Sequence, residues 1–218
     1  MPIQESNVLI LKPTTMFLSF LSEQLADENL INTAELHTNH IAYTFNKHDT
    51  DEENLAEIER QFPKMFKHEI QRVLGKNTYD CSINASFLDF LCCFKFKLHS
   101  QIVLMENSIQ DGQQLLCIQP RQGLLHWMKV SNPNTQEWLA AKEALRLSDL
   151  TDNATVLIKN FTHEQDAKQF VQHYYQPLFK AEMFRLCDDK QHWPEVTSLQ
   201  MFNRYFSVKH YTELVHLH

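Results

Sequence analysis

The stretch 86–107, SFLDFLCCFKFKLHSQIVLMEN, is the most conspicuous apolar segment of the chain, and its interpretation decides the fold. Asp89, Lys95, Lys97 and His99 interrupt its apolar residues. Each charge near the centre of a bilayer costs roughly 2.5–3.5 kcal/mol, so we exclude a membrane span. The segment is therefore expected to lie in the interior of a folded domain.

Two secondary structures compete for this stretch. Ser86 and Asp89 match a helix start with a capping box, and the apolar residues that follow recur at helical spacing. The alternative is a strand over 92–99, in which apolar and polar residues alternate. Because no β-branched residue occurs before Ile102, we predict the helix. The residues of its apolar stripe are Phe87, Leu91, Phe94, Leu98, Ile102 and Met105.

The adjacent Cys92 and Cys93 raise the question of a thiol site. A reactive thiol needs exposure and a nearby group that lowers its pKa, but phenylalanine and leucine flank this pair on both sides. We predict that both cysteines pack in the core as small hydrophobic side chains. The odd number of five cysteines, without framework spacing, is typical of reduced thiols in a cytosolic protein.

Glycine occurs only at positions 75, 112 and 123. A phosphate-binding loop, a dinucleotide fingerprint and a nucleophile elbow each need closely spaced glycines that these positions cannot supply. P-loop hydrolysis, Rossmann-type binding and α/β-hydrolase chemistry are therefore improbable, and we expect no cofactor. So few glycines also favour a helix-rich chain.

The formal net charge of −7 and the pI of about 5.9 disfavour nucleic acid as a partner, because an acidic chain repels the phosphate backbone. The first residues lack the basic start and long apolar run of a secretory signal. We therefore expect a cytoplasmic protein without membrane insertion. We expect its partners to be proteins, and an oligomer of this chain is a further possibility.

Several further elements follow from local patterns. Strands are predicted around 8–11, 41–45 and 154–161, and a helix capped by Thr50 and Glu53, with Pro63 kinking or splitting it. A hairpin is predicted around a Pro-Gly turn within 115–130. Further helices are predicted after Thr15, Asn134 and Thr162 and from Pro194, and Pro177 should kink or restart the third of them.

Strands and helices in this order do not alternate strictly, so an α+β fold fits better than a doubly wound sheet. We predict a single helix-rich domain over residues 1–218 with a small, mainly antiparallel sheet. A subdivision near 107–114 or 131–134 is the alternative. The length is sufficient for one full-size core.

No catalytic, cofactor-binding or metal-binding residue can be assigned. His37 with His40 and His216 with His218 are short pairs that lack zinc-site spacing. The acidic run 49–54, DTDEEN, lacks the glycine of a calcium loop and is better explained as a helix start. The loop 187–196 brings Asp188, Asp189, Lys190, His192 and Trp193 together in sequence, which leaves a hydrolase or transferase site there as an alternative.

Apolar residues near the C-terminus point to protein binding instead. Met201, Tyr205 and Tyr211 fall outside the apolar stripe that contains Phe202 and Phe206. Apolar surface of this kind is typical of interaction sites. We predict an interaction surface within 193–206. Its candidate partner-binding residues are Trp193, Met201, Phe202, Tyr205 and Phe206.

The acidic charge, the scarcity of glycine and amphipathic helices such as TDEENLAEIERQFPKMFKHEIQRVLG give the chain the general character of a known group of proteins. It resembles bacterial secretion chaperones and adaptors, and is similar in size and acidity to the LvgA-type adaptors of the Dot/Icm type IV coupling complex. The resemblance implies cytosolic residence, protein partners and no ATP hydrolysis. We expect a non-enzymatic adaptor or chaperone that acts in the cytosol, with a secretion system as its setting.

Overall fold

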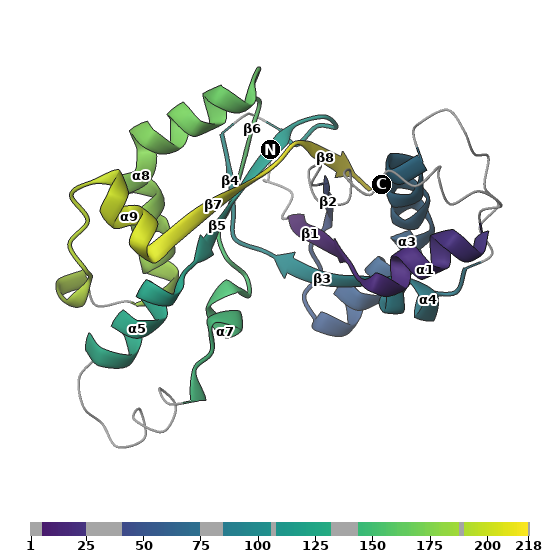
Figure 1. Ribbon diagram of the computed structural model, residues 1–218, viewed down its shortest axis with the longest axis horizontal. Coiled ribbons are helices and arrows are strands. Elements are labelled where there is room, and N and C mark those ends of the chain that lie inside the picture. Colours follow the sequence, from purple (N-terminus) through teal and green to yellow (C-terminus); the bar gives the residue numbers. More distant parts are fainter. Residues whose placement is uncertain are drawn as a thin grey trace. The chain divides into compact units, whose positions relative to one another are not determined.

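The computed structural model describes residues 6–24, 41–74, 85–105, 108–131, 144–187 and 190–217 (Figure 1). Contacts divide the chain into two compact units. Unit 1 comprises residues 1–98, 110–112 and 212–218, and unit 2 comprises residues 99–109 and 113–211. The prediction of one domain over 1–218, with its alternative subdivisions, stays a prediction.

Unit 1 is built on a four-stranded sheet in the order β3-β1-β2-β8. β1 (Ser6–Pro13) runs antiparallel to β2 (Ile41–Asn46), which pairs in parallel with β8 (Glu213–His216). All residues from Ile41 to Phe45 are buried, so β2 is covered on both faces, although apolar Ile41, Tyr43 and Phe45 alternate in its sequence as in a half-buried strand. The helices of this unit are α1 (Thr15–Gln24), α3 (Asp51–Leu74) and α4 (Phe87–Cys93).

Helix α3 confirms the predicted start and is not split at Pro63, which was one of the two outcomes predicted there. The Thr50 hydroxyl accepts from the Glu53 amide and the Glu53 carboxylate accepts from the Thr50 amide, both at 3.2 Å. The helix then continues through Pro63. Pro63 and Glu59 are both exposed, so the backbone carbonyl that loses its helical donor lies on the solvent side, where water can replace it. Gly75, which follows α3 directly and is a residue type common at helix C-caps, lies outside the described residues.

The described part of the stretch 86–107 is partly helix and partly strand. The capping box is present, since the Asp89 amide donates to the Ser86 hydroxyl at 3.2 Å and the Ser86 amide donates to the Asp89 carboxylate at 2.8 Å. The helix ends at Cys93, however, and β3 covers Phe94–His99. The predicted helical stripe to Met105 is therefore wrong, and the alternative strand describes these residues.

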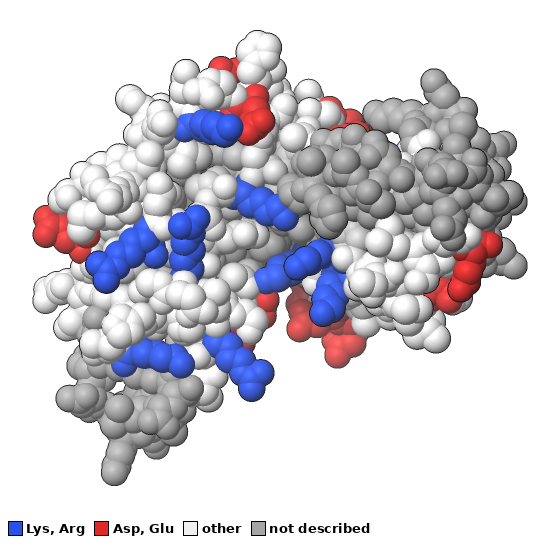
Figure 2. All heavy atoms as spheres, in the orientation of Figure 1, with Lys and Arg blue, Asp and Glu red and all other residues white. Residues whose placement is uncertain are grey.

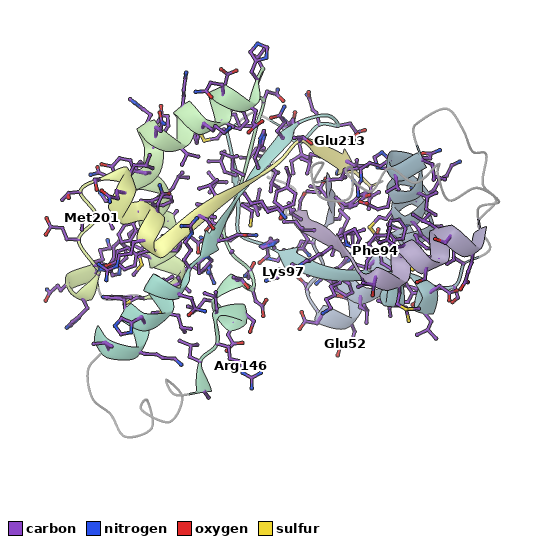
Figure 3. The ribbon with its side chains drawn as sticks, in the orientation of Figure 1. Glu52, Phe94, Lys97, Arg146, Met201 and Glu213 are labelled. Carbon is purple, nitrogen blue, oxygen red and sulfur yellow. The ribbon has the colours of Figure 1, made fainter. Side chains whose placement is uncertain are left out.

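Aromatic packing explains why Phe94 turns inward at this junction. Its ring lies 4.6 Å from the Phe17 ring and 5.7 Å from the Phe66 ring, and all three are buried (Figure 3 labels Phe94). Within β3, Lys95 and Lys97 are exposed, as expected for a strand of period two. Cys93 is buried, which confirms the core interpretation for that thiol, but Cys92 is exposed, so the prediction was wrong there.

Unit 2 is built on a second four-stranded sheet, in the order β4-β6-β5-β7. β4 (Ile102–Leu104) is parallel to β6 (Val156–Lys159), whereas β5 (Gln114–Pro120) is antiparallel to both β6 and β7 (Phe206–Tyr211). The helices are α5 (Gln122–Ser131), α7 (Leu147–Thr151), α8 (Glu164–Leu186), the 3-10 helix η2 (Lys190–His192) and α9 (Leu199–Tyr205).

The hairpin predicted within 115–130 is only half correct. Its first strand is β5, but its second half is the helix α5. Gly123 therefore lies inside a helix, and the close approach of α9 explains the glycine. A Cβ atom at this position would clash with the carbonyl oxygen of Arg204.

Two other helix starts are displaced from their predicted positions. α8 begins one residue late, with the His163 amide donating to the Asp166 carboxylate at 2.9 Å, and it continues through Pro177 without a break. The last helix begins at Leu199 rather than Pro194, because the Ser198 hydroxyl caps it by accepting from the Met201 amide. The helix predicted from Asn134 lies largely outside the described residues.

The α+β fold class is confirmed, with the strands divided between two small mixed sheets rather than one. Among the described residues, no helix is both long enough and apolar enough to span a membrane.

Candidate protein-binding surface

The predicted interaction segment 193–206 lies in unit 2, where it follows the C-terminal end of α8. Two of its five candidate residues lie beneath the surface, in the core of unit 2. Phe202 and Phe206 are fully buried, with their rings 5.7 Å apart, and the Phe206 ring lies 5.9 Å from that of Phe179. They fix α9 and β7 to α8 and have no exposed area to offer a partner.

Trp193 is half-buried and held in a defined orientation. Its indole N–H donates to the backbone carbonyl of Cys187 at 2.9 Å. Its ring meets the Phe184 ring edge-to-face, with centroids 4.9 Å apart and planes at 90°. Because the hydrogen bond and the ring contact restrict different rotations, Trp193 presents a preformed apolar face.

Phe184 is a surface residue that the sequence analysis missed. Half of its side chain is exposed (50%), and the ammonium group of Lys190 lies 4.4 Å from its ring centroid. The buried residues of α8 near this end are Leu178, Phe179, Glu182 and Met183. Phe184 falls outside that stripe, and this departure was the available signal.

Met201 and Tyr205 extend the apolar surface along α9. Met201 is 36% exposed and lies on the outer side of the helix (Figure 3). Its sulfur accepts a hydrogen bond from the Thr197 hydroxyl at 3.3 Å. Tyr205 is half-buried, and the Arg204 guanidinium carbon lies 5.9 Å from its ring centroid. Both are therefore available for contact, and the partner-binding role of the five residues stays a prediction.

The alternative catalytic loop is only partly described. Asp188 and Asp189 lie outside the described residues, while Lys190 and His192 belong to η2 and are both exposed. The Lys190 ammonium group lies over an aromatic ring, a contact typical of surface packing. The hydrolase or transferase hypothesis stays a prediction.

In the parts of the chain that the structure describes, no three His, Cys, Asp or Glu side chains gather as a metal site would require. His216 lies beside the Thr44 hydroxyl at 2.8 Å, whereas His37, His40 and His218 lie outside the described residues. Burial raises the pKa of Cys93 to about 11, which keeps that thiol protonated at neutral pH.

A shallow groove of about 420 Å³ lies beside the first turns of α8 and is lined by Lys159, Asp166 and His173 among others. Hydrogen bonds of the Gln114 side chain hold the part of the groove wall at Phe161. The Gln114 side-chain amide donates to the Phe161 carbonyl at 3.1 Å, and its oxygen lies 2.6 Å from Nε2 of His210. The Asp166 carboxylate accepts the hydrogen bond from the His163 amide that caps α8. The groove therefore has a lining of mixed polarity, and we assign no acid–base pair to it.

Comparison of the chain with known protein families, with curated proteins and with solved structures finds no match in any of the three.

Proposed function

We propose that this protein is a non-enzymatic adaptor or chaperone that binds another protein through the surface formed by Phe184, Trp193, Met201 and Tyr205. The observation that carries the proposal is the exposed ring of Phe184, which packs edge-to-face on the half-buried ring of Trp193. A large aromatic side chain that is half exposed leaves apolar area in water, and burial against a partner recovers that free energy.

The rigidity of this pair supports binding rather than incidental exposure. The hydrogen bond from Trp193 to Cys187 and the edge-to-face contact with Phe184 fix both rings before a partner arrives. Preorganised aromatic residues lose little side-chain entropy on association, and tryptophan is enriched among residues that dominate binding energy. The resemblance to secretion adaptors supports the cytosol and a secretion system as the setting.

Site-specific photo-crosslinking tests the proposal. A benzophenone amino acid is placed at position 184 and the protein is expressed in its native host. Matched controls carry the same group at Met16 or Leu88, which are 55% and 70% exposed and belong to unit 1. We expect a defined crosslinked protein from position 184 that the control positions do not give.

Once that protein is identified, Phe184→Ala should weaken its binding by about 2 kcal/mol, or roughly thirtyfold, as expected for a central aromatic contact. Crosslinks equally frequent at all three positions, or an unchanged dissociation constant in Phe184→Ala, would exclude this surface.

A further inference from the structure

Two segments of unit 2 contain no acidic residue. They are residues 113–131 and 196–212. Residue 212 is the one position of the second segment that lies beyond the boundary of unit 2. The whole chain has 27 Asp and Glu among 218 residues, so segments of this combined length would carry about four at the average density. Basic residues are retained in both segments, as Arg121, Lys129, Arg204 and Lys209.

The fold places these two segments side by side. β5 and β7 pair in antiparallel register from Leu115 opposite Tyr211 to Pro120 opposite Phe206. Beyond the strands, the Arg121 amide donates to the Tyr205 carbonyl at 2.8 Å, and the Arg121 guanidinium donates to the Asn203 carbonyl at 2.9 Å. α5 also meets α9 at Gly123. The two acid-free segments therefore form one continuous structure.

We use the term basic face for the surface that carries Arg121, Lys129, Arg204 and Lys209. The first three residues are exposed and Lys209 is half-buried. In Figure 2, blue side chains are spread over the area that α5, α9 and β7 occupy in Figure 1, and red ones lie mostly towards its edges. Tyr205 lies within this surface and supplies an aromatic ring.

The distribution of charge along the chain makes this face more distinctive. Unit 2 contains 11 Lys and Arg and 11 Asp and Glu, whereas unit 1 contains 9 and 16. The whole formal charge of −7 therefore belongs to unit 1, whereas unit 2 is formally neutral, and its described segments 113–131 and 196–211 carry no acid. Complementary charge governs which partners approach a surface of this kind.

We propose that the basic face is a docking surface for an acidic segment of a partner protein, held by Arg121, Lys129 and Arg204. This inference rests on the proposed protein-binding function and names the chemistry of the partner. A protein segment fits better than a nucleic acid, because the charge of unit 1 repels a long phosphate backbone, whereas a short acidic segment meets only the basic face.

The test measures binding of a labelled peptide of about twelve residues that alternates Glu or Asp with Leu or Phe. Fluorescence anisotropy gives its dissociation constant for the full chain at low and moderate salt. The variant Lys129→Gln/Arg204→Gln removes two charges of the basic face. The matched control, Lys64→Gln/Lys67→Gln, removes two exposed charges from α3.

We expect the basic-face variant to bind the peptide at least about fivefold more weakly, the control to bind as the parent does, and added salt to weaken parent binding. Circular dichroism melts establish that both variants are folded, and Arg204→Lys should retain binding because it keeps the charge. Equal weakening in the two double variants, or binding that is indifferent to salt, would refute the docking surface.

A single-stranded oligonucleotide of equal charge is the second probe. Tighter binding of the oligonucleotide than of the peptide would overturn the assignment to an acidic protein segment. Crosslinking at position 184 tests the adaptor function separately. If that crosslink forms while the peptide fails to bind, the basic-face inference falls and the proposed function stands.

Discussion

Replacement of Glu182 by glutamine should destabilise unit 2 far more than the same replacement at an exposed glutamate of the same helix. Glu182 is fully buried on α8, where one carboxylate oxygen accepts from the Thr155 amide. The other oxygen accepts from Nε and Nη2 of Arg185 at 3.2 and 2.9 Å. Arg185 also donates to the backbone carbonyls of Leu150 and Asp152, at 2.6 and 3.1 Å. The pair therefore ties α8 to α7 and to the residues that follow it.

The magnitude follows from the arrangement of donors and acceptors. In Glu182→Gln the side-chain oxygen could still accept from Thr155, but the new amide group would face the guanidinium donors. The guanidinium of Arg185, whose side chain is only 14% exposed, would then lack a counter-charge. Breaking one side of a buried ion pair costs about 3–5 kcal/mol. With a urea dependence of about 2 kcal/mol per M, which is typical of small proteins, the unfolding midpoint should fall by about 1.5–2.5 M.

Tryptophan fluorescence during urea unfolding is the appropriate assay, because Trp127, Trp138 and Trp193 all belong to unit 2. The control is Glu164→Gln, which breaks a pair with Lys168 at 2.7 Å whose side chains are 69% and 62% exposed. Its midpoint should stay unchanged, since exposed pairs contribute little. Equal midpoints for the two variants would refute the reasoning that burial decides the strength of these pairs.

Three further predictions concern other parts of the chain. Gly123→Ala should lower the free energy of unfolding by about 1–3 kcal/mol, although alanine favours helices, because its Cβ would meet the Arg204 carbonyl; a calorimetric melt that shows stabilisation would contradict this. Burial lowers the pKa of His210, so the unfolded chain binds the proton more readily, and stability should fall as pH drops below the ordinary histidine pKa of about 6.5; His210→Gln should show a smaller loss between about pH 7.5 and 5, and an identical pH profile would exclude His210 as the cause. Cys92→Ser should remove one rapidly reacting thiol in an Ellman assay at about pH 8, whereas Cys93→Ser should leave the number of fast thiols unchanged, because Cys93 is buried with a pKa of about 11; rapid labelling of Cys93 in the native protein would count against the buried assignment.

Part of the candidate surface could be predicted from the amino-acid sequence. Met201 and Tyr205 fall outside the apolar stripe of the last helix, and the structure leaves both of them, like Trp193, partly accessible. Phe202 and Phe206 were assigned to the same surface, but they pack against Phe179 and α8 instead. Phe184 was missed although it departs from the buried stripe of α8, because its contact with Trp193 joins two different elements that no periodic pattern connects.

The features that sequence alone determined are those whose interactions close within one helical turn. The capping boxes at Thr50 with Glu53 and at Ser86 with Asp89 use donors and acceptors three residues apart, so the same atoms meet in any helix that starts there. The α+β class follows from the same local patterns, summed over the chain. The lack of closely spaced glycines is likewise a property of composition.

Tertiary structure decided the elements whose backbone partners lie far away in the chain. The segment after Cys93 carries both a helical and an alternating pattern, and it became a strand because it pairs with β1, which lies near the start of the sequence. Gly123 lies in a helix rather than a turn, at the place where α9 packs closely against α5. Phe206 belongs to β7, not to the last helix, and pairs with β5. Local propensities make the helical and extended conformations of such a segment differ only slightly in free energy. Hydrogen bonds and buried rings contributed by distant segments outweigh that difference.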